Sequence, residues 1–121
     1  MIVRGLFCSI LVLFILYLTS QAELTYVPIR GKLAIYGKYM VDLPPDESKD
    51  SHMYFHLEGD SARSLWNSMK VNTEYDECID NGSKTKRIGN MQCTQQVDDK
   101  TFDCYFSIDV QKQSIENGIN C

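Results

Sequence analysis

Two histidines separated by four positions, His52 and His56, are the first residues to consider for metal chemistry. On a helix this spacing would bring both imidazoles to one face, where they could share a zinc ion. The segment around them instead alternates in hydrophobicity, which predicts a strand. Four residues of strand place the two attachment points about 13 Å apart, too far for one ion with ligands at about 2 Å. We therefore expect no metal site at this pair.

The cysteines could bind metal, act as nucleophiles or form disulfides. The sequence holds five, and no two of them form the Cys-x-x-Cys motif that many zinc sites use. Four lie in the second half of the chain, namely Cys78, Cys93, Cys104 and Cys121. An even number spread over an exported domain is typical of disulfides. We expect these four to pair, which leaves no thiolate for catalysis.

Other residues with catalytic or ion-binding potential lack the spacing that such sites require. Acidic residues gather at 46–50 and 74–80 without the Asp-x-Asp-x-Asp-Gly pattern of a calcium loop, which predicts solvated loops. The serines at 61, 64 and 68 have no Gly-x-Ser-x-Gly frame. We expect no catalytic residue, no cofactor and no enzymatic activity. Asn81 begins an N-glycosylation sequon, whose use depends on the organism.

The first 22 residues have the organisation of a signal peptide. Arg4 provides a positive charge, and residues 6–18 are almost wholly apolar. A helix of that length rises about 20 Å, less than the ~30 Å hydrocarbon core of a bilayer. Small residues at Ser20 and Ala22 predict cleavage before Glu23. We expect a secreted or periplasmic protein with no stable membrane anchor after cleavage, and an uncleaved anchor is the alternative.

Cleavage would leave residues 23–121, which we expect to fold as one small domain. It would remove Cys8, and with it the odd thiol. The loss of Arg4 would change the net charge from −4 to −5. Because nucleic-acid phosphates and anionic lipids repel an acidic domain, nucleic acid is not an expected partner.

Hydrophobic periodicity in residues 23–121 predicts an α+β fold. Strands are expected where residues alternate in hydrophobicity, within 24–43, 52–57, 84–97 and 101–110, and a last strand fits 114–121. Within 84–97, Gly89 is interpreted as a β-bulge. We expect an antiparallel sheet of about four to six strands, stapled by disulfides.

A short amphipathic helix is predicted over residues 61–70 and should pack on one face of the sheet. Its apolar residues recur at helical spacing, and they are Ala62, Leu65, Trp66 and Met69. Asp60 precedes them and is suited to cap the helix. A helix this short is marginal alone, so burial of Trp66 against the sheet must stabilise it.

Two strands alternate clearly enough to assign a buried face. In 52–57 the odd-numbered residues are apolar and should face the core, whereas the even-numbered ones, both histidines included, should face solvent. In 101–110 the even-numbered residues are apolar and should be buried, whereas the odd-numbered ones should be wet.

The disulfide pairing depends on the hairpin around residues 98–100, which contains Cys93 and Cys104. A two-residue turn at 98–99 would set these cysteines directly opposite, whereas a four-residue turn at 98–101 would leave them diagonal. The second register matches the apolar residues better, and directly opposed positions have a wider Cβ separation than disulfides prefer. We favour Cys78–Cys93 with Cys104–Cys121 over the alternative, Cys93–Cys104 with Cys78–Cys121.

Three segments, 55–66 (FHLEGDSARSLW), 88–93 (IGNMQC) and 104–106 (CYF), resemble small exported bacterial proteins of uncharacterised function that have a four-cysteine mature domain. The similarity covers most of residues 23–121. A strand-Gly-helix junction and a cysteine-bearing hairpin carry it. The resemblance implies a periplasmic or secreted location and transfers no catalytic residue.

The expected role is that of a non-catalytic exported protein that binds another macromolecule, most simply a protein, through the wet face of the sheet or the polar loops. A narrower version is an inhibitor of a basic cell-wall hydrolase such as a lysozyme, because an acidic domain attracts a cationic enzyme. A small secreted enzyme is the alternative from another class, and an envelope structural component is the third.

Overall fold

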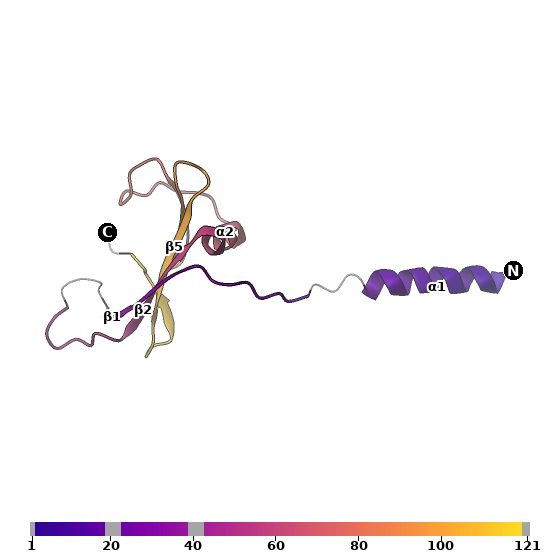
Figure 1. The fold of residues 1–121 in the computed structure, drawn as a ribbon, viewed down its shortest axis with the longest axis horizontal. Helices are drawn as coiled ribbons and strands as arrows, with labels where there is room; N and C mark the ends of the chain where they lie inside the picture. Colours follow the sequence, from indigo (N-terminus) through magenta and orange to yellow (C-terminus); the bar gives the residue numbers. More distant parts are fainter. Residues whose placement is uncertain (1, 19–22, 39–42, 120–121) are drawn as a thin grey trace.

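The computed structural model describes residues 2–18, 23–38 and 43–119. The first helix, α1 (Ile2–Leu18), projects away from the sheet, and residues 23–30 approach the sheet without regular structure (Figure 1). Neither helix in the described ranges is long and apolar enough to cross a membrane. The predicted cleavage position after Ala22 falls at the edge of the described ranges, because Ala22 itself lies outside them.

The described residues form one antiparallel sheet of six strands and a second helix. The strands are β1 (Gly31–Tyr36), β2 (His52–Glu58), β3 (Lys84–Ile88), β4 (Met91–Gln95), β5 (Phe102–Asp109) and β6 (Ser114–Glu116). Their order is β1-β2-β5-β4-β3, and β6 also pairs with β5. Strand β2 pairs with one edge of β5. The other edge of β5 pairs with β4 along its first half and with β6 along its second half. The predicted α+β class, with one helix packed on an antiparallel sheet, is confirmed.

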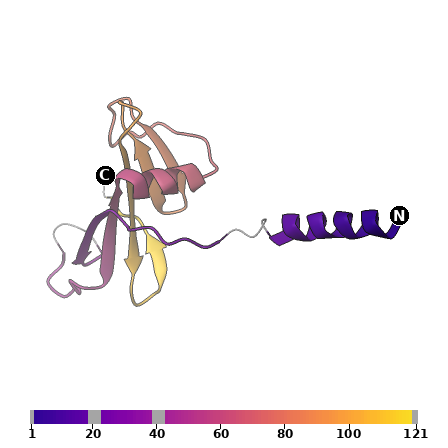
Figure 2. The same cartoon turned by 45° about the vertical axis from the view of Figure 1, so that its right-hand side comes forward.

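Helix α2 (Gly59–Ser68) follows β2 directly and lies across one face of the sheet (Figure 2). Helix and sheet residues together form the core, which comprises Ala62, Trp66, Met69, Cys93, Phe102 and Cys104. Trp66 is 7% exposed, and its ring meets Phe102 edge-on at a centroid distance of 5.7 Å. The predicted burial of Trp66 is confirmed.

The prediction that Asp60 caps this helix is wrong. Glu58 occupies the N-cap position without a side-chain hydrogen bond that caps the helix, and Asp60 lies in the first turn. The reason is Gly59, whose φ of +56° turns the strand straight into the helix. The helix therefore begins and ends two residues earlier than the sequence pattern suggested.

The predicted strand over 84–97 is in fact a hairpin of two strands. Ile88 pairs with Met91, so Gly89 and Asn90 form a two-residue turn between β3 and β4. Gly89 has a φ of +55°. A positive φ at the first central position is typical of the type II′ turns that close hairpins. Gly89 therefore marks a chain reversal rather than the predicted β-bulge.

The disulfide pairing favoured from the sequence is also wrong, because Cys93 and Cys104 are bonded to each other. They lie directly opposite in the β4–β5 register, with Cα atoms 4.0 Å apart. A backbone hydrogen bond joins Gln96 to Thr101, three residue pairs away, so the alternation of the ladder makes the cysteines a non-hydrogen-bonded pair. Facing side chains approach most closely in such pairs. Cys78 is disulfide-bonded as well, and Cys121 lies outside the described residues.

Asp98 accounts for this register. Its Oδ1 accepts the backbone N–H groups of Lys100 at 2.9 Å and Thr101 at 2.8 Å, and its Oδ2 accepts the Thr101 hydroxyl at 2.6 Å. Asp99 has a φ of +57° within the same turn. Val97, which the diagonal register would have paired with Phe102, is instead 63% exposed. Hydrogen bonding in the turn thus outweighs the matching of apolar residues.

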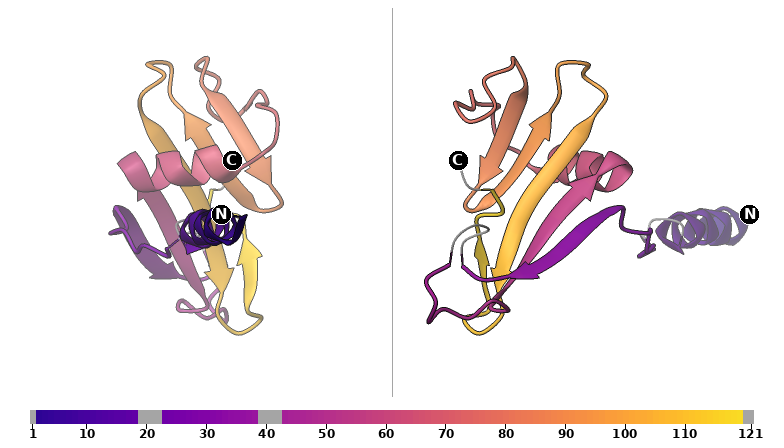
Figure 3. Two further views of the ribbon diagram at one scale, coloured as in Figure 1. Left: turned by 90° about the vertical axis from the view of Figure 1, so that its right-hand side faces the viewer. Right: turned by 60° about the vertical axis from the view of Figure 1, so that its left-hand side comes forward.

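The sheet face opposite α2 is more buried than predicted. This face carries His52, Tyr54 and His56 in β2 and Tyr105, Ser107 and Asp109 in β5. The side chains expected to face solvent but at most 7% exposed are His52, Tyr54, Ser107 and Asp109. Non-sheet segments lie on this side (Figure 3, right), so we term it the loop-covered face.

Side-chain hydrogen bonds attach the covering segments to this face. The Tyr54 hydroxyl donates to the carbonyl of Gly37 at 2.7 Å, and the Ser107 hydroxyl donates to that of Asn117 at 2.8 Å. Conversely, the ten-residue helix covers only part of the other face. Val110, predicted to be buried there, is 43% exposed. The alternation of apolar and polar residues assigns side chains to the two faces of the sheet correctly. It does not show which parts of each face other segments will cover.

Candidate functional site

The two histidines lie towards opposite ends of β2, as the predicted strand requires. Each lies beside two carboxylates. The two groups are His52 with Asp109 and Glu116, and His56 with Glu58 and Asp103. In each group, one potential ligand atom from every residue lies within 4.8 Å of the other two. The pairing of β5 with β2 and with β6 brings these residues together, and sequence reasoning missed both groups because strand pairing is not visible in the sequence.

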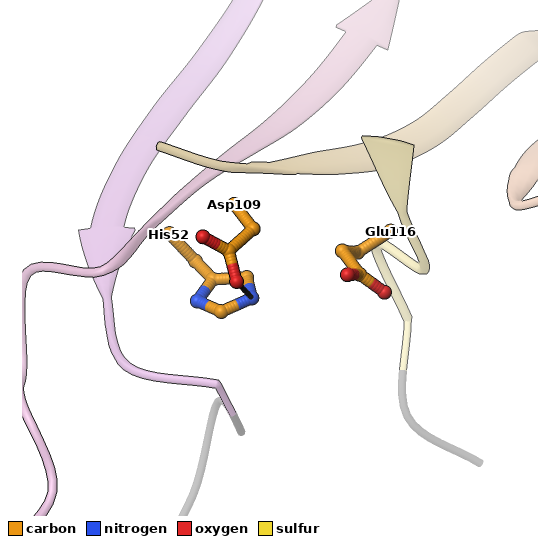
Figure 4. Close-up of side chains that lie close together, drawn as sticks. All are labelled: His52, Asp109 and Glu116. Carbon is orange, nitrogen blue, oxygen red and sulfur yellow. Dashed lines mark ion pairs between the residues drawn. The ribbon is translucent and has the colours of Figure 1, made fainter. Parts of the chain in front are cut away.

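The first group (Figure 4) has two buried members, His52 and Asp109, and one partly exposed member, Glu116. His52 is 5% exposed and Asp109 is 7% exposed. Nε2 of His52 lies 3.7 Å from Oδ2 of Asp109, and its Nδ1 lies 2.8 Å from the Oγ of Ser51. Glu116 enters from β6, where its Oε1 accepts a hydrogen bond from the Ser114 hydroxyl at 3.1 Å.

Asp109 also closes the turn between β5 and β6. Its Oδ1 accepts the backbone N–H groups of Gln111 at 3.1 Å and Lys112 at 3.0 Å. The hydrogen bond from Lys112, helped by the charges of His52 and Lys112 itself, lowers the pKa of Asp109 even though burial opposes the shift. The carboxylate is therefore ionised at neutral pH, and its Oδ2 faces His52.

The second group is partly exposed and already hydrogen-bonded. Nε2 of His56 lies 2.7 Å from Oδ1 of Asp103, whereas its Nδ1 lies 3.8 Å from Oε1 of Glu58. The ring stacks on Tyr105 with a centroid distance of 4.4 Å. Burial, followed by the charges of Asp103 and Glu58, raises the pKa of Tyr105. Tyr105 is thus a neutral phenol next to an oriented imidazole.

A groove of about 800 Å³ opens beside this second group. Its floor belongs mostly to the loop-covered face and includes Ala34, Tyr54, His56, Thr94 and Tyr105. Ile79 and Ile119 line it from outside the sheet. A concave site of this size, with aromatic and aliphatic walls and a few polar groups, is typical of ligand-binding sites.

Asp76 fixes the loop that supplies Ile79. We expected the acidic residues of 74–80 to be solvated, but Asp76 is 6% exposed. Its Oδ1 accepts the backbone N–H of Cys78 at 2.9 Å, and its Oδ2 accepts the Gln92 amide at 2.8 Å. One wall of the groove is therefore attached to β4.

The site residues predicted from the sequence were the four cysteines, of which the structure joins Cys93 to Cys104 below α2.

A scan against protein-family models, a search of curated proteins and a search of solved structures found no match to this chain. The loop-covered face, with its groove and its two histidine–carboxylate groups, is the candidate functional surface.

Proposed function

We propose that this chain is an exported, non-catalytic protein that binds another protein through the groove on its loop-covered face. The observation that carries the proposal is the groove, whose volume of about 800 Å³ suits a few side chains of a projecting segment. Disulfide bonding is characteristic of proteins outside the reducing cytosol, which supports export.

The proposed partner is a basic protein. After cleavage the chain would carry a net charge of −5. Glu58 and Asp103 add local negative charge, because both contact His56 at the groove. Complementary charge accelerates association and favours a cationic partner over an anionic one. A basic cell-wall hydrolase such as a lysozyme is the narrower form of this proposal.

Two neighbouring residues of β1 provide a matched test. Ala34 lines the groove, whereas Ile35 points to the other face of the sheet and is 59% exposed. The Ala34→Arg variant places a bulky cation in the groove, and Ile35→Arg places the same group on the opposite face. Both changes lie on an exposed edge strand, so both variants should fold.

The experiment is a pull-down from cell-envelope extract with the wild type and both variants, followed by titration of each with purified lysozyme. We expect the wild type and Ile35→Arg to retain one stoichiometric basic partner, and Ala34→Arg to lose it. Retention by Ala34→Arg, or equal loss in both variants with normal melting temperatures, would contradict a role for the groove. Lysozyme binding with the same pattern would support the narrower proposal.

Export itself is tested at the N-terminus. Cleavage after Ala22 predicts that N-terminal sequencing of the exported protein begins at Glu23. Recovery of intact Met1 in the membrane fraction would instead favour the uncleaved anchor.

A small secreted enzyme is the second candidate, and the hydrogen bond between His56 and Asp103 favours it. A carboxylate that orients an imidazole is the arrangement of many general bases. Against it, the Thr94 hydroxyl in the groove is buried and lies 3.3 Å from that of Thr85, so it is not poised to act as a nucleophile. Hydrolysis of peptidoglycan by the wild type that disappears in His56→Gln would favour the enzyme.

A further inference from the structure

We propose that His52, Asp109 and Glu116 bind a divalent transition-metal ion, for which Zn²⁺ is the test ion. An imidazole nitrogen with two carboxylate oxygens is a ligand set that zinc accepts, with water in the fourth position. With a neutral imidazole, the two carboxylates balance the charge of the ion. This site is separate from the groove, because none of the three residues is among those that line it.

Each proposed ligand has a neighbour that binds one of its polar atoms, and in His52 and Asp109 another atom faces the group. Ser51 contacts Nδ1 of His52, so Nε2 faces Asp109. The backbone N–H groups of the β5–β6 turn hold Oδ1 of Asp109, and Oδ2 faces His52. Ser114 donates to Oε1 of Glu116. Supporting contacts of this kind orient the ligands in known metal sites.

The distances between the proposed ligand atoms are close to those found around a tetrahedrally coordinated ion. Zinc with ligands at about 2.0–2.1 Å brings neighbouring ligand atoms to about 3.3 Å from each other. Nε2 of His52 lies 3.7 Å from Oδ2 of Asp109, beyond hydrogen-bond length but near this value. All three ligand atoms lie within 4.8 Å of one another. Glu116 completes the site by side-chain rotation, and Figure 4 shows its carboxylate on the same side as the other two groups.

The second histidine group explains why the ion should prefer the first. His56 directs Nε2 to Asp103 and Nδ1 to Glu58, so its shortest contacts with the two carboxylates use different nitrogens. Its side chain is 26% exposed, against 6% for His52. His56 is therefore the matched control, since it offers the same residue types on the same strand in a group that is more exposed and less favourably arranged.

The test is calorimetric titration of Zn²⁺ into chelator-treated protein, using the wild type, Asp109→Asn, Glu116→Gln and His56→Gln. Asp109→Asn keeps the Oδ1 acceptor that closes the turn but replaces Oδ2. We expect one ion per wild-type chain, and at least about 100-fold weaker binding in Asp109→Asn, more than loss of a supporting partner costs. Glu116→Gln should also weaken binding, and His56→Gln should leave it unchanged.

Thermal unfolding separates metal binding from folding. Zn²⁺ should raise the melting temperature of the wild type and of His56→Gln but not that of Asp109→Asn. Without metal, Asp109→Asn should melt somewhat below the wild type, because a neutral amide accepts weaker hydrogen bonds from the turn than the carboxylate does. Glu116→Gln therefore provides the metal-free comparison on a partly exposed residue. Absence of wild-type binding, or equal loss in His56→Gln, would overturn the proposal and leave the groove proposal untouched.

Discussion

The two faces of this sheet are buried by different means. Below α2, apolar side chains and the Cys93–Cys104 disulfide make a dry core around Trp66. On the loop-covered face, His52, Tyr54, Ser107 and Asp109 are equally inaccessible, but each is polar and hydrogen-bonded or ion-paired. Among the described residues, no buried side-chain nitrogen or oxygen lacks a hydrogen-bond partner.

Because of this difference, we expect the face below α2 to contribute mainly to stability and the loop-covered face mainly to the specificity of binding. Burial of apolar area is the main source of folding free energy, whereas a buried polar network contributes little net stability but fixes one geometry. We therefore expect the largest stability losses from changes below α2, and changes in binding from the loop-covered face. The following variants test this division, from the largest expected effect to the smallest.

Replacing Trp66 by alanine should destabilise the protein most. Trp66 packs against Phe102 and is covered by the Lys86 ammonium group, whose Nζ lies 4.6 Å from the centre of the indole ring system. Truncation of a buried tryptophan costs about 3–5 kcal/mol. Urea denaturation should show this loss in the free energy of unfolding. An unchanged transition midpoint would mean that the helix does not depend on this contact.

Removing the disulfide with Cys93→Ala and Cys104→Ala together should cost about 2–3 kcal/mol, because the closed loop is short. Urea denaturation of the double variant, compared with oxidised wild type, measures the effect. Non-reducing peptide mapping after cleavage at Lys100 should recover Cys93 linked to Cys104. A map that instead links Cys78 to Cys93 would contradict the β4–β5 register.

On the loop-covered face, Tyr54→Phe should have a smaller effect. The hydroxyl donates to the carbonyls of Gly37 at 2.7 Å and Lys38 at 2.9 Å, so its loss should cost about 1 kcal/mol. Tyr26→Phe is the control, because Tyr26 is 88% exposed. A loss as large as that of Trp66→Ala would show that the two faces contribute equally to stability.

The turn at Asp98 should give the smallest effect and one that depends on pH. Hydrogen bonds from the Thr101 hydroxyl and from backbone N–H groups lower the pKa of Asp98 from 3.8 to about 2. A lowered pKa in the folded state means that the contribution is full above about pH 4 and is lost as the pH falls towards 2. The difference in melting temperature between wild type and Asp98→Ala should shrink over that range. A constant difference would exclude the ionised carboxylate as its source.

The features that the sequence predicted correctly are those set by short-range periodicity. The stripe through Trp66 marked α2, and alternation marked β2 and β5 as strands. The errors arose where one residue changes the chain direction, as at Gly59 and Gly89, or where a side chain fixes a register, as at Asp98. Each of these depends on a local geometry that hydrophobic periodicity does not encode.

The candidate site was hidden for a different reason. Asp109 is one of several odd-numbered residues that alternation marked as wet, and Glu116 lies in a strand of three residues. Both reach His52 only through the pairing of β5 with β2 and β6. Covering segments then exclude water from a face whose composition looks solvated. A polar strand face that folds under loops cannot be told from a solvent-exposed one by sequence alone.

The most direct test of the division between the two faces is side-chain NMR of the protein during titration with its captured partner. Binding in the groove predicts shift changes at the methyl groups of Ile79 and Ile119 and at the ring of Tyr105, with the Trp66 indole unaffected. Shift changes centred on Trp66 and the exposed side of α2, with the groove signals unmoved, would contradict it.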